Sequence, residues 1–281
     1  LLQTSKRYYK FDFFILLIIP MSSLVSVVIV AYNSSPFIVE TLDSVLKQTW
    51  AEIELIITDD CSTDDTVEIC RNWINKFGRR FFRIELITSE NNTGISANAN
   101  RGLYVTKGDW IKFLGADDIL KPDCIKDNME FIASNHDVKV LFSRIEVYSD
   151  SFKSKNLIET IPGIPYNPKG ILAPQRCADS QYKMLLTSDR IHFTPSAFLF
   201  RDTIIAIQGF DERFKFLEDY PLWLTLTKNG IRLHFMDKTT VGYRRHSGAV
   251  NNSGRDYLVN PNYFKSEQFR RIYTYPYLPA T

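Results

Sequence analysis

The sequence predicts an α/β protein with a central, mostly parallel sheet flanked by helices and a smaller antiparallel part in the C-terminal half. Three observations lead to this class. Strand-like and helix-like segments alternate over the first 115 residues. The first strand-like segment is apolar and β-branched along its length, as in strands buried on both faces. A β-α-β-α-β-α-β order requires parallel strands joined by right-handed crossovers.

Seven elements carry this alternation. Strands are expected from residue 24 to the turn at 33–36, and at 53–58, 82–88 and 110–114. Apolar residues at helical spacing predict helices between the strands: Ile38, Leu42, Val45 and Leu46 in the first, Val67, Cys70, Trp73, Ile74 and Phe77 in the second, and residues 94–104 as the third.

After residue 122 the pattern is looser. It predicts helices at 125–134, 176–186 and 201–207, and one opening at 218. Strands are expected at 139–148, 196–200, 231–235 and 239–244, with the last two antiparallel to each other.

Composition excludes some functions. Of 281 residues, 34 are basic and 32 acidic, which gives a formal net charge of +2 and argues against a nucleic-acid binder with a broad basic surface. The four cysteines (Cys61, Cys70, Cys124 and Cys177) form no CxxC pair. They are expected to be free thiols in a reducing compartment, which indicates a cytoplasmic protein.

Residues 1–22 are a separate N-terminal extension. A basic stretch at 6–10 precedes an apolar run at 13–19, which is about half the length that a membrane span needs. Two interpretations stay open: a short anchor at a membrane surface, or translated sequence upstream of a start at Met21. We favour the second because a core strand begins three residues after Met21.

Polar residues follow three of the four predicted parallel strands. Asn33, the pair Asp59-Asp60 and the pair Asp117-Asp118 all stand at carboxyl ends. Such ends gather on one edge of the sheet, where ligands bind in open α/β folds. Adjacent carboxylates suit Mg²⁺ or Mn²⁺ shared with substrate phosphates. The alternative is an acidic turn that caps the next helix. The first strand has no GxGxxG turn, so a common dinucleotide fold is not indicated.

Several segments, taken in their order along the chain, resemble those of the inverting nucleotide-sugar glycosyltransferases of family 2, which have the GT-A fold. The resemblance covers about residues 24–253. It is carried by these segments: Val-Ser-Val-Val-Ile-Val-Ala-Tyr-Asn at 25–33, Val-Leu-Lys-Gln-Thr at 45–49, Ile-Thr-Asp-Asp-Cys-Ser-Thr-Asp at 57–64, Asn-Thr-Gly-Ile-Ser at 92–96, Lys-Gly-Asp-Trp at 107–110 leading into Asp117-Asp118, Gly-Phe-Asp-Glu at 209–212, and Glu-Asp-Tyr-Pro-Leu-Trp at 218–223.

The resemblance implies roles for individual residues. The nucleotide-binding set is Tyr32, Asn33, Asp59, Asp60, Asn92, Gly94, Arg101 and Asp117. The metal set, for Mn²⁺ or Mg²⁺, is Asp118, Asp117 and His246, the last in a late Tyr-Arg-Arg-His motif in which a basic or His side chain reaches the diphosphate or metal. The catalytic set is Asp219 as general base and Glu218 beside it.

The resemblance also implies a function. It predicts transfer of a hexosyl or N-acetylhexosaminyl group, from a UDP-sugar, to a hydroxyl of a glycan or lipid-linked acceptor in bacterial cell-surface polysaccharide synthesis. Residues 23–255 would form one domain, with a nucleotide-binding half at 23–120 and an acceptor half at 121–255, followed by a C-terminal helix or tail at 256–281.

Further partners are hypotheses. A homodimer is one. Peripheral contact with the inner face of the cell membrane is another, and it would involve the aromatic and basic residues Phe264, Lys265, Phe269, Arg270 and Arg271.

The chain departs from the family pattern at two places. Gly115 stands where many relatives carry a first Asp before the acidic pair, and the basic residue of the third helix is Arg101. Two other functions therefore stay open: a non-catalytic sugar-nucleotide-binding or scaffold protein of the same fold, and a nucleotidyltransferase. The site residues also have structural interpretations, with Asp60 as a turn residue, Glu218 and Asp219 as helix caps and His246 as a loop residue.

Overall fold

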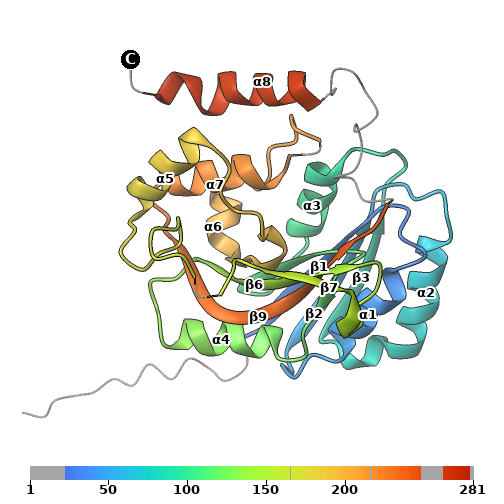
Figure 1. Ribbon diagram of the computed structural model, residues 1–281. Helices are drawn as coiled ribbons and strands as arrows, with labels where there is room; N and C mark the ends of the chain where they lie inside the picture. Colours follow the sequence, from blue (N-terminus) through green and yellow to red (C-terminus); the bar gives the residue numbers. More distant parts are fainter. Residues whose placement is uncertain (1–22, 165, 216, 248–261, 279–281) are drawn as a thin grey trace, which may run out of the picture.

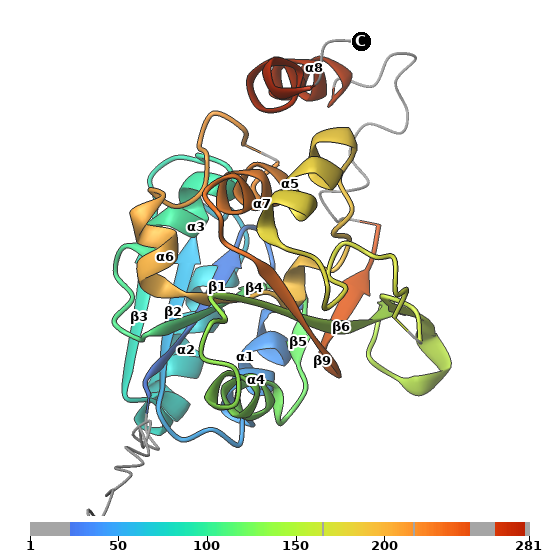
Figure 2. The same cartoon turned by 90° about the vertical axis from the view of Figure 1, so that its left-hand side faces the viewer.

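The computed structural model describes residues 23–164, 166–215, 217–247 and 262–278 (Figure 1). The extension at 1–22, with both interpretations given for it, lies outside the described residues. One mixed sheet forms the centre of the molecule. In Figures 1 and 2, helices α1, α2 and α4 lie on one face of the sheet, and α3, α5, α6 and α7 lie on the other.

The elements follow the predicted alternation. Strands are β1 (Val25–Ala31), β2 (Ile53–Asp59), β3 (Arg83–Thr88), β4 (Trp110–Gly115), β5 (Ile119–Leu120), β6 (Val140–Ser149), β7 (Leu157–Ile161), β8 (Phe198–Phe200) and β9 (Leu233–Arg245). Helices are α1 (Ile38–Leu46), α2 (Thr66–Phe77), α3 (Ile95–Leu103), α4 (Cys124–Ala133), α5 (Ala178–Thr187), α6 (Arg201–Ala206), α7 (Asp219–Lys228) and α8 (Asn262–Tyr273).

Strand order confirms the predicted fold class. The order is β3-β2-β1-β4-β8-β6-β9-β5, with β7 paired to β6. The pairs β3–β2, β2–β1 and β1–β4 are parallel, whereas β8 runs antiparallel to both of its neighbours. The change from parallel to antiparallel pairing falls at the β4–β8 boundary, which joins the two halves of the chain.

The prediction of two antiparallel strands at 231–235 and 239–244 was wrong. Both segments belong to the single strand β9, which runs parallel to β6. The polar residues that resembled a turn form a bulge, since the pairing shifts from Phe142 opposite Phe235 to Arg144 opposite Thr239. Arg144 donates a hydrogen bond to Asp237 inside this bulge, and the pairing of β6 with β9 continues beyond it.

The parallel half is packed tightly around β1. Val25, Val28 and Ile29 are fully buried, as a strand covered on both faces requires. Helix α3 lies so close to this strand that a Cβ at Gly102 would overlap the Val28 side chain. The missing side chain therefore sets how near α3 comes to the sheet.

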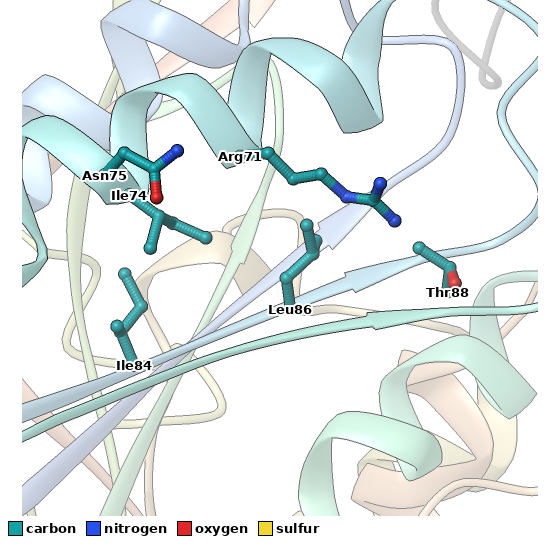
Figure 3. A pocket seen from close by; sticks show the side chains of 6 residues that line it. All are labelled: Arg71, Ile74, Asn75, Ile84, Leu86 and Thr88. Atoms are coloured by element: carbon teal, nitrogen blue, oxygen red, sulfur yellow. The ribbon is translucent and has the colours of Figure 1, made fainter.

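A hollow of about 370 Å³ lies between α2 and the edge strand β3 (Figure 3). Its lining residues are Arg71, Ile74, Asn75, Ile84, Leu86 and Thr88. The hollow carries no carboxylate, so it is not where the acidic strand ends lie.

Helix α8 packs with its aromatic side toward the protein. Phe269 is 2% exposed and contacts the rings of Phe214, Tyr220 and Tyr273. The Phe269 ring is enclosed by the chain itself, which contradicts its predicted part in a membrane contact, while the membrane contact as such stays a prediction. Arg270 and Arg271 are exposed, and the side chains of Phe264 and Lys265 lie outside the described part. Among the described residues no helix is long and apolar enough to cross a bilayer.

Candidate active site

The carboxyl ends of β1, β2 and β4 lie side by side. Register places Ala31 opposite Asp59, and Val30 opposite Gly115. The loops beyond the strands are bonded to each other, because Asn33 donates its backbone N–H to Ser62 Oγ at 2.8 Å and accepts the Thr63 N–H at 2.8 Å. The strand order alone thus brings Tyr32, Asn33 and both acidic pairs to one edge of the sheet.

Asp60 is buried and fully engaged by the protein. Its carboxylate accepts the backbone N–H groups of Thr93 and Gly94, at 2.9 and 2.7 Å, and Arg101 Nη2 at 3.0 Å. Burial alone would raise the pKa of Asp60, but the hydrogen bonds from Thr93, Arg101 and Gly94 outweigh it and hold this pKa below its usual range. Asp60 therefore stays ionised and fixes the loop that enters α3.

Arg101 reaches the same edge from α3. Besides Asp60 it contacts Thr93 Oγ1 at 2.6 Å and Asn98 Oδ1 at 2.7 Å. The basic residue that departs from the family pattern is thus directed at the strand ends. Gly94 directly precedes α3 and has a φ of 95°. A Cβ at this residue would lie 2.8 Å from Lys215 Cβ.

The remaining nucleotide candidates differ in exposure. The ring of Tyr32 is 47% exposed, and Asn92 is exposed as well. Asp59 is 1% exposed and accepts the Ser62 N–H at 2.9 Å, which makes it a turn-forming residue. Tyr32 therefore offers an open aromatic face, while Asp59 supports the turn behind it.

Asp117, Asp118 and His246 come together after β4 and β9. His246 Nε2 lies 3.0 Å from Asp117 Oδ2. Asp118 is 3% exposed and accepts the Arg244 backbone N–H at 2.9 Å. Burial and the charge of Asp117 raise the pKa of Asp118 well above its ordinary value. The pair thus combines a buried carboxyl, Asp118, with a partly exposed one, Asp117.

Sequence reasoning missed the structural role of Arg244 in the late basic motif. Its side chain is 3% exposed and donates to Asp117 O at 2.8 Å and Glu40 Oε2 at 2.6 Å. Its guanidinium also lies over the rings of Phe37 and Phe152, at 4.8 and 4.3 Å. The Arg244 side chain therefore holds the acidic turn, which carries Asp117 and Asp118, in place. His246 is the residue of the late basic motif that contacts the Asp117 carboxylate.

The acidic turn has the chemistry of a divalent-cation site. Two adjacent carboxylates, one buried with a raised pKa, provide hard oxygen ligands and a charge that a cation would offset. Within the described ranges no three His, Cys, Asp or Glu side chains are already arranged around a metal position. At Gly115, a Cβ would lie 2.7 Å from Asp117 Oδ1, so the Asp117 carboxylate uses the space beside residue 115.

Glu218 and Asp219 stand at the start of α7. Asp219 Oδ2 accepts the Thr194 hydroxyl at 2.8 Å, and its Oδ1 accepts the Tyr220 N–H at 2.7 Å. Burial and the neighbouring Asp219 charge raise the pKa of Glu218 to about 7. Asp219 is thus held in one orientation by a hydroxyl from another segment, a contact that a simple helix cap does not need.

Replacing Glu218 with Gln should change how stability depends on pH. The folded pKa of about 7 exceeds the ordinary value of 4.5, so the folded state keeps a proton that the unfolded chain releases between these values. The free energy of unfolding of the wild type therefore falls as pH rises through this window, by about 1–2 kcal/mol after allowance for partial solvation.

The measurement is urea denaturation at pH 5 and pH 8. Glu218→Gln should gain stability relative to the wild type at pH 8 but not at pH 5. Glu68→Gln, at an exposed position of α2, is the control and should show no such difference. An equal effect of Glu218→Gln at both pH values would contradict the assignment.

Comparison with known proteins identifies the family. Residues 26–206 match glycosyl transferase family 2. The UDP-Glc:α-D-GlcNAc-diphosphoundecaprenol β-1,3-glucosyltransferase WfaP of Escherichia coli is 32% identical over 244 residues, 86% of this chain and 86% of that protein.

Two solved structures share the fold. Staphylococcus aureus TarS in complex with UDP-GlcNAc gives a TM-score of 0.61 at 22% identity, over 89% of this chain and 66% of that one. The mannosyltransferase PcManGT of Pyrobaculum calidifontis, with GDP-Man and Mn²⁺, gives 0.57 at 16% identity, over 89% of this chain and 61% of that one. Because the family match runs from β1 through α6 and a relative is 32% identical over 86% of both chains, the chain belongs to glycosyl transferase family 2.

Proposed function

We propose that this glycosyltransferase transfers a hexosyl or N-acetylhexosaminyl group from a UDP-sugar, with inversion, to a hydroxyl of a glycan or lipid-linked acceptor in bacterial cell-surface polysaccharide synthesis. One observation carries the proposal: the strand ends bring Asp60, Asp117 and Asp118 to the edge where such folds bind nucleotides. Support for the donor and acceptor comes from WfaP, whose name gives a UDP-Glc donor and a diphosphoundecaprenol-linked acceptor, and from TarS with UDP-GlcNAc.

On the donor side, Tyr32 presents its exposed ring to the nucleotide base, and the exposed residues Asn33 and Asn92 belong to the loops that follow β1 and β3. Asp60 and Arg101 shape the pocket by holding the loop at 93–94. Family resemblance implies that Asp60 accepts a hydrogen bond directly from the base. For this, one of the protein groups that now donate to Asp60 would have to move away. We therefore assign Asp60 to loop positioning first.

At the diphosphate, Asp118 and Asp117 would hold Mn²⁺ or Mg²⁺, with His246 steadying Asp117. When bound, such an ion stabilises the negative charge of the departing diphosphate as a Lewis acid. Arg244 keeps the acidic turn in register with β9 through its contacts to both aspartates. The geometry of the turn is thus set before a ligand arrives.

On the acceptor side, Asp219 takes the proton of the attacking hydroxyl. A positioned base contributes about 10²–10⁴-fold to such a step. The carboxylate stands at the start of α7, and the Thr194 hydroxyl orients it. Attack from the face opposite the diphosphate inverts the anomeric carbon, since a single displacement needs only this one base.

The test is a thermal-shift panel with UDP, GDP, CMP and dTDP, each with and without Mn²⁺. We expect UDP to raise Tm in a metal-dependent way, because stabilisation grows as RT ln(1 + [L]/Kd). Transfer is then assayed with UDP-Glc and UDP-GlcNAc on a GlcNAc-diphospholipid acceptor, with the product anomer assigned by NMR. A Tm unchanged by every nucleotide would instead support the non-catalytic scaffold.

A further inference from the structure

One charged residue lies inside the otherwise apolar strand β4. Lys112 is 0% exposed, between Ile111 and Phe113. Removing an ammonium group from water is costly unless partners compensate, and an apolar side chain of similar length would fill the same space without that cost. Burial lowers the pKa of Lys112 to about 8, while the charge of Asp118 acts in the opposite direction. The strand therefore carries a cation for a reason other than packing.

The ammonium group binds the opposite half of the protein. Lys112 Nζ donates to Pro195 O at 2.8 Å and lies 3.4 Å from Ala197 O. Pro195 lies in the short turn η3 (Thr194–Ser196) and Ala197 directly follows it, before β8. The contact thus joins β4, the strand that ends at the acidic turn, to the turn that precedes β8.

The turn η3 is anchored on its other side as well. Ser196 Oγ donates to Phe193 O at 2.8 Å and accepts the Ser143 N–H from β6 at 3.1 Å. With both ends fixed, the remaining polar side chain of the turn, Thr194, points its hydroxyl to Asp219 at 2.8 Å. A continuous set of bonds therefore runs from β4 through Lys112 and η3 to the proposed base.

We infer that Lys112 is a positioning residue, which acts through the η3 turn and Thr194 to hold the Asp219 carboxylate at a fixed place relative to the acidic end of β4. This inference rests on the proposed function, in which Asp219 is the base. A displacement of about 1 Å in a reacting group can cost on the order of 10²-fold in rate. A small shift of η3 is therefore enough to be seen in kcat.

The experiment compares Lys112→Met, Thr194→Val and the double variant. We expect each single variant to lower kcat about 10-fold or more, with KM for the UDP-sugar and the Kd of UDP by calorimetry within about twofold of the wild type. The double variant should lose little more than one single variant, because both changes break the same chain of bonds. Thr194→Ser, which keeps the hydroxyl, should recover most of the kcat that Thr194→Val loses.

Two controls separate positioning from folding. Thr227 lies in α7, the helix that begins at Asp219, and its buried hydroxyl donates to Trp223 O and Leu224 O. Thr227→Val removes this hydroxyl and should leave kcat unchanged. Lys121 forms an ion pair with Glu146, outside the chain of bonds from Lys112 to Asp219. Lys121→Met should therefore also leave kcat unchanged.

Either of two results would overturn the inference: wild-type kcat in Lys112→Met, or losses that multiply in the double variant. If Lys112→Met does not fold, unchanged kcat in Thr194→Val still overturns it. Retained turnover in Asp219→Asn would instead overturn the proposed base, so the two failures are distinguishable.

Discussion

Replacing Asp219 with Asn is expected to lower kcat by about 10²–10⁴-fold, because the amide cannot accept the proton of the acceptor hydroxyl. The substitution keeps the shape of the side chain: the single amide oxygen can still accept the Tyr220 N–H, and the amide NH2 can donate to the Thr194 hydroxyl, which donates to Asp219 in the wild type. Donor binding should therefore stay within about twofold of the wild type. The measurement is steady-state transfer together with calorimetric binding of UDP.

A matched substitution controls for the loss of a carboxylate at a helix start. Asp202 lies in the first turn of α6 with a side chain 75% exposed, so Asp202→Asn should leave kcat and UDP binding unchanged. If Asp219→Asn lost rate and UDP affinity together, Asp219 would be a ligand-binding or structural residue and not the base.

Replacing Asp118 with Asn is expected to have two opposite effects. Metal-dependent stabilisation by UDP should disappear, a loss of about 2.7 kcal/mol at a ligand concentration 100 times Kd. In the metal-free protein near pH 8, however, Tm should rise. The raised pKa of Asp118 means that its ionisation destabilises the folded state as pH increases above the ordinary 3.8, and a neutral amide removes this effect.

The measurement is Tm with EDTA and with UDP plus Mn²⁺, at pH 5 and pH 8. The gain in metal-free stability should appear at pH 8 and shrink at pH 5. Asp109→Asn, at the opposite end of the β4 segment and exposed, should change neither quantity. A full metal-dependent UDP shift in Asp118→Asn would show that the cation is held elsewhere.

The sequence was sufficient for the half of the fold in which each strand is buried on both faces. There the strands are mostly apolar, with single charges inside them at Glu54 and Lys112, so β1, β2 and β4 were predicted near their observed bounds, and the parallel order then indicated where Asp60 and Asp118 lie. The structure adds that Asp60 is already occupied by Thr93, Gly94 and Arg101.

The C-terminal half was less predictable for physical reasons. A bulge carries β9 past the polar residues at 237–238, and a single sequence shows them only as a turn signal. The two-residue strand β5 and the exposed strand β7 have too little apolar pattern to be recognised. Lys112 was visible as one charge in an apolar run, but its partners are backbone carbonyls 83 and 85 positions away, which no side-chain pattern encodes.

Gly115 has a consequence for how this site can vary among related sequences. Because a Cβ at 115 would lie 2.7 Å from Asp117 Oδ1, a side chain there requires the end of the Asp117 side chain to shift, and the other oxygen of that carboxylate, Oδ2, is the atom that lies 3.0 Å from His246 Nε2. Position 115 is therefore sterically coupled to Asp117. An aspartate restored at 115 would enter space that the Asp117 carboxylate now uses, so the effect of that substitution depends on where the Asp117 side chain moves.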